Sequence, residues 1–310
     1  NRIFIYPIVC NNHFLLLIKG INKSIILCKK FKFNLLYSQD PFGTALIGNI
    51  IRKIFKIPLL IGNHSSFVRN KDWINERPIY FRFLSFLMYL NLPLADAWRV
   101  NNKKEKEKYI YYHRIQANRI VVNNTLVDTK TFTKKFDSNL IKDFKLTITK
   151  DLSTKLLLWA GRPVKFKRIN LLINTFNEVQ KTNPNTKLVL VGNFKNSTLL
   201  NKLLENIDTS LKEKIYIYSK GADHSLLSKF YKVSDIYLHT SVYEGYGVVL
   251  SEAALSGLPI VSTTSDGSRE NIEDGKSGFL VDSHTASEMA KYINLLLNNE
   301  TLRKEMSKYT

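Results

Sequence analysis

In the second half of the chain, short apolar runs alternate with stretches whose apolar residues recur every three or four positions. The run Lys155–Ala160 (KLLLWA) ends at a glycine and is typical of a buried strand. Apolar residues from 169 to 179 then recur at helical spacing until Asn183 and Pro184 end the pattern. Further strands are expected at residues 187–191, 215–218, 236–239, 259–262 and 279–281, and further helices at 225–233 and 248–255. This alternation predicts right-handed βαβ units and a parallel, doubly wound sheet.

The first half shows the same alternation less clearly. Strands are expected at residues 33–37, 58–62 and 119–122, and helices near residues 44–55, 77–92 and 103–113. Residues 128–154 are polar and irregular, as in a linker between domains. The pattern therefore predicts an α/β protein of two Rossmann-like doubly wound domains, residues 1–150 and 151–310, that face a central cleft. Ligands of such sheets bind beyond the carboxyl ends of the strands, often at a helix N-terminus.

The composition narrows the class of protein. The 310 residues are 44% hydrophobic and 23% charged, which is ordinary for a globular protein. The longest apolar stretch without charge, residues 83–95, has about 13 residues, short of the roughly 20 that span a bilayer. Cys10 and Cys28 do not make a disulfide framework, which favours a reduced, cytoplasmic setting. The six histidines are scattered, so we expect no metal site.

The net charge of +20 lies almost entirely in the first half. Residues 1–150 carry 26 Lys and Arg against 9 Asp and Glu, a balance of +17, whereas residues 151–310 carry 20 against 17. Such a field attracts nucleic acid, an acidic membrane leaflet or phosphate-bearing substrates. The alternative is a lysine-rich composition without a partner behind it. Residues 80–89 (YFRFLSFLMY) predict either an interfacial helix on an anionic membrane or a helix packed in the core.

Candidate chemistry begins at residues 241–247 (SVYEGYG), between the strand that ends at His239 and the helix that begins at Val248. Two glycines let the backbone approach a ligand, and the free N–H groups of a helix start can hold a phosphate. Glu244 in the loop and Glu252 in the helix can both face the cleft, where carboxylates accept hydrogen bonds from a sugar or ribose diol. Taken alone, the two glutamates fit an ordinary loop and a solvated helix face at least as well.

A second loop, residues 161–167 (GRPVKFK), follows the first strand of the same half. Arg162 can hold a phosphate through two hydrogen bonds and Lys167 can act as a point charge, so the two suit a diphosphate leaving group. An exposed basic loop is the alternative. The two loops, in order within one doubly wound sheet, favour a pocket for a diphosphate sugar.

These segments resemble the family 4 retaining glycosyltransferases of the GT-B fold. The E-x7-E motif of that family appears as Glu244 to Glu252, with Tyr246 where the family usually has Phe. Its G-R-L-x-x-x-K motif appears as residues 161–167, with Pro163 in place of Leu. Residues 256–262 (SGLPIVS) and 274–280 (DGKSGFL) resemble two further stretches of the family, and residues 39–45 with His64 match its acceptor domain less strictly.

The resemblance implies catalytic roles for four side chains. Arg162 and Lys167 would bind the diphosphate and stabilise it as charge builds on departure. Glu244 would contact the donor sugar near its 3- and 4-hydroxyls. His64 would reach the sugar from the other domain, near the anomeric carbon. The family retains anomeric configuration by a same-face route without a clear protein nucleophile.

The resemblance also implies six donor-binding positions: Ser219, Gly221, Gly247, Val248, Val249 and Glu252. Glu252 would hydrogen-bond the ribose hydroxyls, and Ser219 and Gly221 would lie near the base. The three residues at the helix start, Gly247, Val248 and Val249, would lie beside the sugar or the phosphates. The family needs no metal and no cofactor beyond its nucleotide-sugar substrate, of the UDP or GDP type. The sequence contains no Asp-x-Asp pair for Mg²⁺.

Two departures from the family pattern concern the ends of the chain. Only 38 residues precede Gln39, without the first strand and Gly-rich loop of the family, and the chain stops soon after Met306, before the family's final helix. We therefore expect a trimmed or incomplete chain, or a degenerate protein.

The function predicted from the sequence is transfer of a sugar from a nucleotide sugar to a glycan or lipid-linked acceptor. We expect this to occur in the cytoplasm at the inner membrane face, with an anionic membrane surface and no nucleic acid among the partners. A GT-B nucleotide-sugar epimerase and a non-catalytic basic binding protein are the alternatives.

Overall fold

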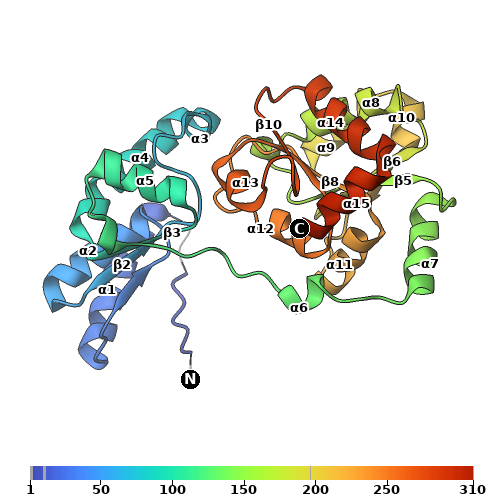
Figure 1. The fold of residues 1–310 in the computed structure, drawn as a ribbon. Helices are drawn as coiled ribbons and strands as arrows, with labels where there is room; N and C mark the ends of the chain where they lie inside the picture. The colour runs from blue at the N-terminus through green and yellow to red at the C-terminus, as the bar shows by residue number, and fades with distance from the viewer. Residues whose placement is uncertain (1–2, 10–11, 196, 310) are drawn as a thin grey trace. The chain divides into compact units, whose positions relative to one another are not determined.

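The computed structural model describes residues 3–9, 12–195 and 197–309. The chain divides into two compact units, Asn1–Asn124 and Thr125–Thr310. Each unit contains one parallel sheet with helices packed on it (Figure 1). The predicted α/β class with two separate parallel sheets is therefore confirmed.

The sheet of the first unit has four parallel strands in the order β1-β2-β3-β4. They are β1 (Leu36–Ser38), β2 (Leu59–Gly62), β3 (Ala97–Val100) and β4 (Ile120–Val122). The helices are α1 (His13–Lys30), α2 (Gly43–Phe55), α3 (Lys71–Glu76), α4 (Pro78–Asn91) and α5 (Lys103–His113), with the 3-10 turns η1 (Leu92–Leu94) and η2 (Ala117–Arg119). Ile61, Trp98 and Tyr109 are buried at the centre of this unit's core.

The sheet of the second unit has six parallel strands in the order β10-β9-β8-β5-β6-β7. They are β5 (Lys155–Ala160), β6 (Thr186–Val191), β7 (Ile215–Tyr218), β8 (Ile236–His239), β9 (Ile260–Thr263) and β10 (Gly278–Val281). The helices are α6 (Thr129–Phe132), α7 (Ser138–Thr149), α8 (Ile169–Gln180), α9 (Thr198–Glu205), α10 (Thr209–Glu213), α11 (His224–Val233), α12 (Val248–Leu255), α13 (Asp266–Asn271), α14 (Ala286–Asn298) and α15 (Glu300–Tyr309), with the 3-10 turn η3 (Lys165–Lys167).

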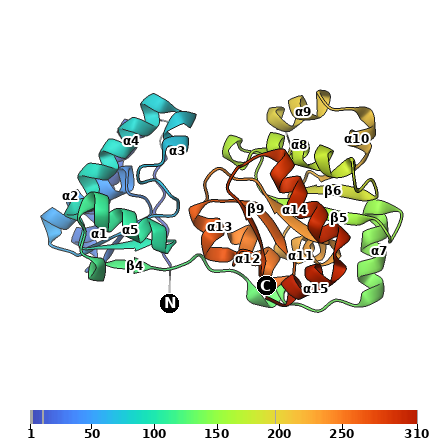
Figure 2. The ribbon, with the colours of Figure 1, turned by 45° about the horizontal axis from the view of Figure 1, so that its top comes forward.

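Alternation along β5 divides the core of the second unit between the two faces of the sheet. Leu157 and Trp159 pack on the face covered by α8 and α14, which lie side by side (Figure 2). Leu156, Leu158 and Ala160 pack on the opposite face, with residues of α7, α11 and α12. Because both faces are covered, the strands are continuously apolar.

The order of the strands determines where a ligand site can form. The chain runs from β5 outward through β6 to β7 and then returns to β8, which pairs with the other edge of β5. This reversal places the loops that follow β5 and β8 side by side at the carboxyl edge of the sheet, where open α/β sheets bind their ligands.

The boundary between the units lies at residue 124, earlier than the predicted boundary at 150. Residues 125–150, which include α6 and α7, belong to the second unit. Phe132 and Ile148 are buried in its core. Residues 125–150 have the polar composition of a linker because only a few large apolar residues anchor them in the core of the second unit.

The pattern of the first half differs from the structure in four elements. The strand expected at residues 33–37 is β1, shifted toward Ser38, and Phe33 is exposed. The strand β3 and the helices α1 and α3 were not predicted, and neither were α9, α10, α13, α14 and α15 in the second half. Cys28 is a half-buried free thiol in α1, whereas Cys10 lies outside the described residues.

We expect Phe132→Ala to lower the free energy of unfolding of the second unit by about 3–5 kcal/mol. The substitution would open a cavity beside Tyr231, whose ring centroid lies 5.6 Å from that of Phe132. Leu126→Ala is the matched control, because Leu126 lies in the same segment but is 93% exposed; its effect should stay below about 0.5 kcal/mol. Urea unfolding followed by circular dichroism measures both changes. Equal effects would contradict the inclusion of residues 125–150 in this core.

Candidate functional site

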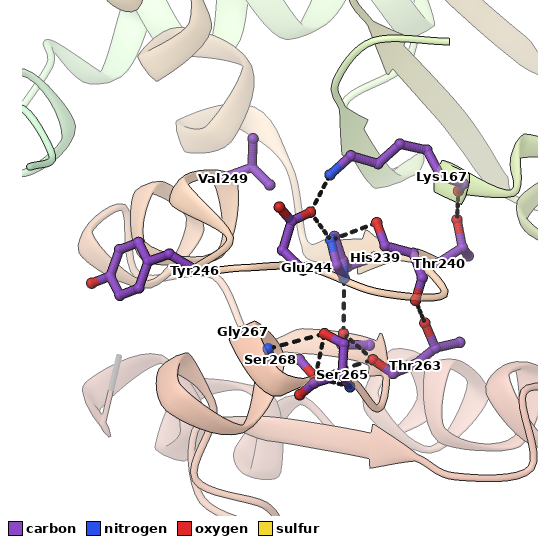
Figure 3. Close-up of polar contacts among 12 residues, drawn as sticks. Lys167, His239, Thr240, Glu244, Tyr246, Val249, Thr263, Ser265, Gly267 and Ser268 are labelled. Carbon is purple, nitrogen blue, oxygen red and sulfur yellow. Dashed lines mark hydrogen bonds and ion pairs between the residues drawn. The ribbon is translucent and has the colours of Figure 1, made fainter. Parts of the chain in front are cut away.

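The loops after β5 and β8 meet at Lys167 and Glu244 (Figure 3). Nζ of Lys167 forms an ion pair with Oε2 of Glu244, and the two side chains are only 13% and 20% exposed. The backbones are joined as well, because the N–H of Val242 donates to the carbonyl oxygen of Phe166 at 2.9 Å and the hydroxyl of Thr240 donates to that of Lys167 at 2.6 Å. The structure thus places two opposite, mostly buried charges together at the carboxyl edge of the sheet.

The carboxyl group of Glu244 is ionised in this environment. Burial raises its pKa, but the polar contacts and charges around it, the ammonium group of Lys167 among them, outweigh burial and lower the pKa to about 2. Nε2 of His239 lies 3.5 Å from Oε2 of Glu244. An ionised carboxylate only accepts hydrogen bonds, so its ligands must be donors such as hydroxyl or amide groups.

The helix α12 begins directly after Gly247, whose φ of 82° lies in the left-handed region. A Cβ at Gly247 would lie 2.8 Å from Cδ1 of Leu250 and 3.2 Å from Cγ of Glu244, so a larger residue would crowd both side chains. Among the described residues, no side chain caps the start of α12. Val248 and Val249 therefore lie at an open helix N-terminus, which favours an anion.

Glu252 lies on α12 in a different environment and is only 4% exposed. The hydroxyl of Tyr231, on α11, donates to its Oε2 at 3.0 Å. Burial raises the pKa of Glu252, and the bond from Tyr231 acts in the opposite direction without cancelling it. The two glutamates of the motif are therefore unlike: Glu244 is ionised beside a cation, and Glu252 is buried beside a phenol.

A segment that sequence reasoning did not single out supports the Glu244 loop. The N–H of Gly267 donates to the carbonyl oxygen of Glu244 at 2.9 Å, and a Cβ at Gly267 would lie 2.7 Å from the carbonyl oxygen of Tyr246. Ser265 and Ser268 cap the start of α13 reciprocally. Their Ser-x-x-Ser spacing after β9 is the signal from which this cap could have been found.

The other predicted residues of the second unit lie in the loops that follow neighbouring strands. Arg162 is exposed in the loop after β5. Ser219 and Gly221 follow β7, where the N–H of Phe194 donates to the carbonyl oxygen of Ser219 and the N–H of Gly221 donates to that of Gly192, both at 3.0 Å. These bonds tie the loop after β7 to the loop after β6. The roles of Arg162, Ser219 and Gly221 in binding phosphate and base stay predictions.

His64 belongs to the first unit and follows β2. Its Nε2 lies 2.6 Å from Oε1 of Gln39, and its Nδ1 lies 3.1 Å from a guanidinium nitrogen of Arg99. Burial and the charge of Arg99 lower the pKa of His64, so its ring is neutral at pH 7. Its predicted contact with a donor sugar involves both units and stays a prediction.

Comparison with known proteins places these loops in a family. Residues 142–310 match the model of the glycosyl transferases group 1. The chain belongs to this family. This glycosyltransferase chain is 27% identical over 215 residues to D-inositol 3-phosphate glycosyltransferase from Corynebacterium aurimucosum. The alignment covers 68% of this chain and 51% of that protein. It is 24% identical over 295 residues to alpha-monoglucosyldiacylglycerol synthase from Acholeplasma laidlawii. That alignment covers 90% of this chain and 70% of the synthase. The chain thus spans about half to about 70% of the length of these curated relatives.

Solved structures agree on the fold of this group 1 chain. HepE of Anabaena, solved in complex with UDP and glucose, gives a TM-score of 0.74 at 18% identity, covering 97% of this chain and 77% of that one. Sucrose-phosphate synthase from Thermosynechococcus elongatus gives 0.80 at 19% identity, covering 97% and 74%. The predicted GT-B fold is therefore confirmed.

No three or more His, Cys, Asp or Glu side chains of the residues that the structure describes are grouped so that they could hold a metal ion. None of the described helices combines the length and the apolar character that crossing a bilayer requires.

The contact with Lys167 predicts that the carboxyl group of Glu244 titrates at an unusually low pH. Because the pKa of Glu244 is lowered from 4.5 to about 2 in the folded state, the ionised group stabilises the second unit above pH 4.5, and this contribution is lost as the pH falls toward 2. Lys167→Met removes the neighbouring charge and should move the midpoint of Glu244 upward, as measured by NMR of its side-chain carboxyl carbon. Lys276→Met, which removes the partner of an exposed ion pair with Glu273, should leave that midpoint in place. The same midpoint in both variants would contradict the assignment.

Proposed function

We propose that the protein transfers a sugar from a nucleotide diphosphate sugar, of the UDP or GDP type, to a glycan or lipid-linked acceptor with retention of anomeric configuration. The observation that carries this proposal is the Lys167–Glu244 ion pair at the carboxyl edge of a doubly wound sheet, beside the open start of α12. A cation and free amides suit a diphosphate, and a carboxylate suits the hydroxyls of a sugar. The family match and the glycosyltransferases among the relatives support the same reaction.

The negative charge of the departing diphosphate explains why basic residues lie at the proposed site. As the bond between the sugar and the diphosphate breaks, negative charge builds on the phosphate oxygens. Lys167, Arg162 and the N–H groups at the start of α12 stabilise that charge, and they are fixed before the reaction begins. These groups perform the task that a metal ion performs in other phosphate sites, so the proposed reaction requires no metal and no cofactor.

The remaining contacts orient the donor. Glu244 accepts hydrogen bonds from sugar hydroxyls, and Glu252 accepts them from the ribose. The base lies near Ser219 and Gly221 at the ends of two neighbouring strands. His64 of the first unit, with its neutral ring, serves the sugar near its anomeric carbon, where the acceptor attacks on the same face from which the diphosphate leaves.

The first unit supports an acceptor that has an apolar part. A pocket of about 460 Å³ beyond β1 is lined mainly by apolar side chains of α1, α2 and α4, with Asp40 and Thr44 among its polar atoms. On α4, Ile79, Phe83 and Phe86 are 90%, 57% and 56% exposed. Residues 1–124 also carry 20 Lys and Arg against 6 Asp and Glu, a balance of +14. An apolar surface with a positive field favours a lipid-linked acceptor at an anionic leaflet on the cytoplasmic side, rather than nucleic acid.

A nucleotide-sugar epimerase is the second candidate function. A protein of Listeria monocytogenes whose structure is assigned to UDP-N-acetylglucosamine 2-epimerase shares the fold, with a TM-score of 0.64 at 17% identity. Incubation with UDP- and GDP-sugars and candidate acceptors separates the possibilities. A glycosylated acceptor with free diphosphate supports transfer, an isomerised sugar supports epimerisation, and neither product supports a non-catalytic binding protein.

Glu244→Ala and Lys167→Ala should each reduce sugar transfer by about 10²- to 10³-fold, because each removes a charge that faces the donor. The control is Glu273→Ala, which breaks the exposed ion pair with Lys276 and should leave transfer within about twofold of the parent. Transfer is measured as diphosphate release with acceptor present, and near-UV circular dichroism checks that each variant is folded. If both site variants transferred sugar at the rate of the parent protein, the assignment of the donor site would be wrong.

The membrane part of the proposal has its own test. Binding to vesicles that contain phosphatidylglycerol should weaken as NaCl is raised, because exposed charges are screened. Phe83→Ser combined with Phe86→Ser should weaken binding further by removing apolar contact, whereas Leu126→Ser, at a 93% exposed site of the second unit, should not. Sedimentation with vesicles measures all three proteins. Equal binding to neutral and anionic vesicles would contradict this part.

A further inference from the structure

Beneath Glu244 lies a histidine to which the proposed function gives no task. His239 ends β8 and is 1% exposed. Its Nε2 lies 3.5 Å from Oε2 of Glu244, the same oxygen that pairs with Lys167 (Figure 3). One carboxylate oxygen therefore contacts both an ammonium group and an imidazole.

Two buried serines define where the imidazole carries its hydrogen. Ser262 donates its hydroxyl to the carbonyl oxygen of Thr263 at 2.8 Å, so its oxygen accepts from Nδ1 of His239 at 3.0 Å. The neutral ring therefore carries its hydrogen on Nδ1 and presents a lone pair at Nε2. Ser241, 3.0 Å from Nε2, donates to that lone pair. Only the doubly protonated ring has an N–H to offer to Glu244.

Three charged side chains face this imidazole: Glu244, Lys167 and Arg168. Burial lowers the pKa of His239, Glu244 acts in the opposite direction, and the charges of Lys167 and Arg168 lower it further. The resulting shift is downward, so the ring is neutral at pH 7 in the free protein. In that state the ammonium group of Lys167 holds the carboxylate.

A nucleoside diphosphate competes with Glu244 for Lys167. Under the proposed function, on which this inference rests, the ammonium group turns toward the phosphate oxygens. Glu244 would then be a mostly buried carboxylate without its counter-ion, which is strongly unfavourable unless another donor replaces the ammonium. Nε2 of His239 is already within 3.5 Å and needs only a proton to become that donor.

We propose that His239 replaces Lys167 as the partner of Glu244 when a nucleoside diphosphate binds. A proton from solvent adds to the lone pair of Nε2, no other covalent bond changes, and the new N–H donates to Oε2 of Glu244. The bond from Nδ1 to Ser262 is kept and fixes the plane of the ring. His239 is thus a positioning residue, because it holds Glu244 in place and does not touch the substrate.

The exchange couples nucleotide binding to proton uptake. Departure of Lys167 removes one of the charges that lower the pKa of His239, and the bound diphosphate adds negative charge nearby. Both changes raise the pKa of His239 in the complex. Between the two pKa values the complex binds more protons than the free protein, so the affinity for the nucleotide falls as the pH rises through that range.

Calorimetric titration with UDP and with GDP, in buffers of different ionisation enthalpy across neutral pH, measures this uptake. We expect up to about one proton per nucleotide bound by the parent. The uptake should vanish in His239→Gln and persist in His113→Gln, a control histidine of the first unit. Nucleotide binding by the parent without proton uptake would overturn the exchange and leave the proposed function standing. Failure of both nucleotides to bind would overturn both.

Two substitutions at His239 separate positioning from packing. The amide of Gln reaches the place of Nε2 and can donate to Glu244 without titrating, whereas the amide of Asn reaches the place of Nδ1 and serves only Ser262. His239→Asn should lower kcat by about 10- to 100-fold, with a smaller change in KM for the donor. His239→Gln should recover most of that loss and flatten the dependence of kcat/KM on pH. Equal losses in the two variants, with a parent-like pH profile, would contradict positioning. Calorimetry on the parent decides the proposal even if a variant does not fold.

Discussion

The ion pair between Lys167 and Glu244 is the constraint on which the site of the second unit depends. Each side chain is mostly buried, so either charge alone would lack both water and a counter-ion. The pair can form because the strand order reverses at β5 and sets the two loops side by side. The same constraint explains two glycines: a side chain at Gly247 would press on Glu244, and one at Gly267 would press on the backbone of the same loop.

The two glutamates of the motif show how one short segment can provide two kinds of acceptor. Their environments move the pKa values in opposite directions, downward for Glu244 beside Lys167 and upward for Glu252 beside Tyr231. Such separation of neighbouring carboxyl groups is typical of sites in which each group has its own task. Under the proposed function, the ionised Glu244 accepts hydrogen bonds from the sugar, and the buried Glu252 accepts them from the ribose. The sequence motif alone did not show whether its two glutamates belong to a site. In the structure, the surroundings of each glutamate give the two carboxyl groups different pKa values.

Much of the second unit could be predicted because its strands are buried on both faces and read as apolar runs, as in Lys155–Ala160. Elements attached by few anchors were missed: Phe132 gives α6 its place in the core within a polar segment, and in β3 the buried Trp98 alternates with partly exposed residues. In the site, Lys167 and Glu244 were visible as charges in strand-end loops. His239 was visible only as the last residue of a strand, because its contact with Glu244 depends on the path of the loop above it.

The two units differ in the kind of feature that each presents to a ligand. In the second unit Lys167 and Glu244 are paired and mostly buried, and Glu252 is buried beside Tyr231, so their geometry follows from the sheet. In the first unit the notable features are an apolar pocket, exposed aromatic side chains of α4 and an excess of positive charge. Such features define the physical class of a partner, apolar and anionic, because apolar contact and screened charge carry little directional information. Buried hydrogen bonds, in contrast, discriminate between individual hydroxyl groups. Under the proposed function, recognition of the donor therefore rests on side-chain geometry, and recognition of the acceptor on surface character.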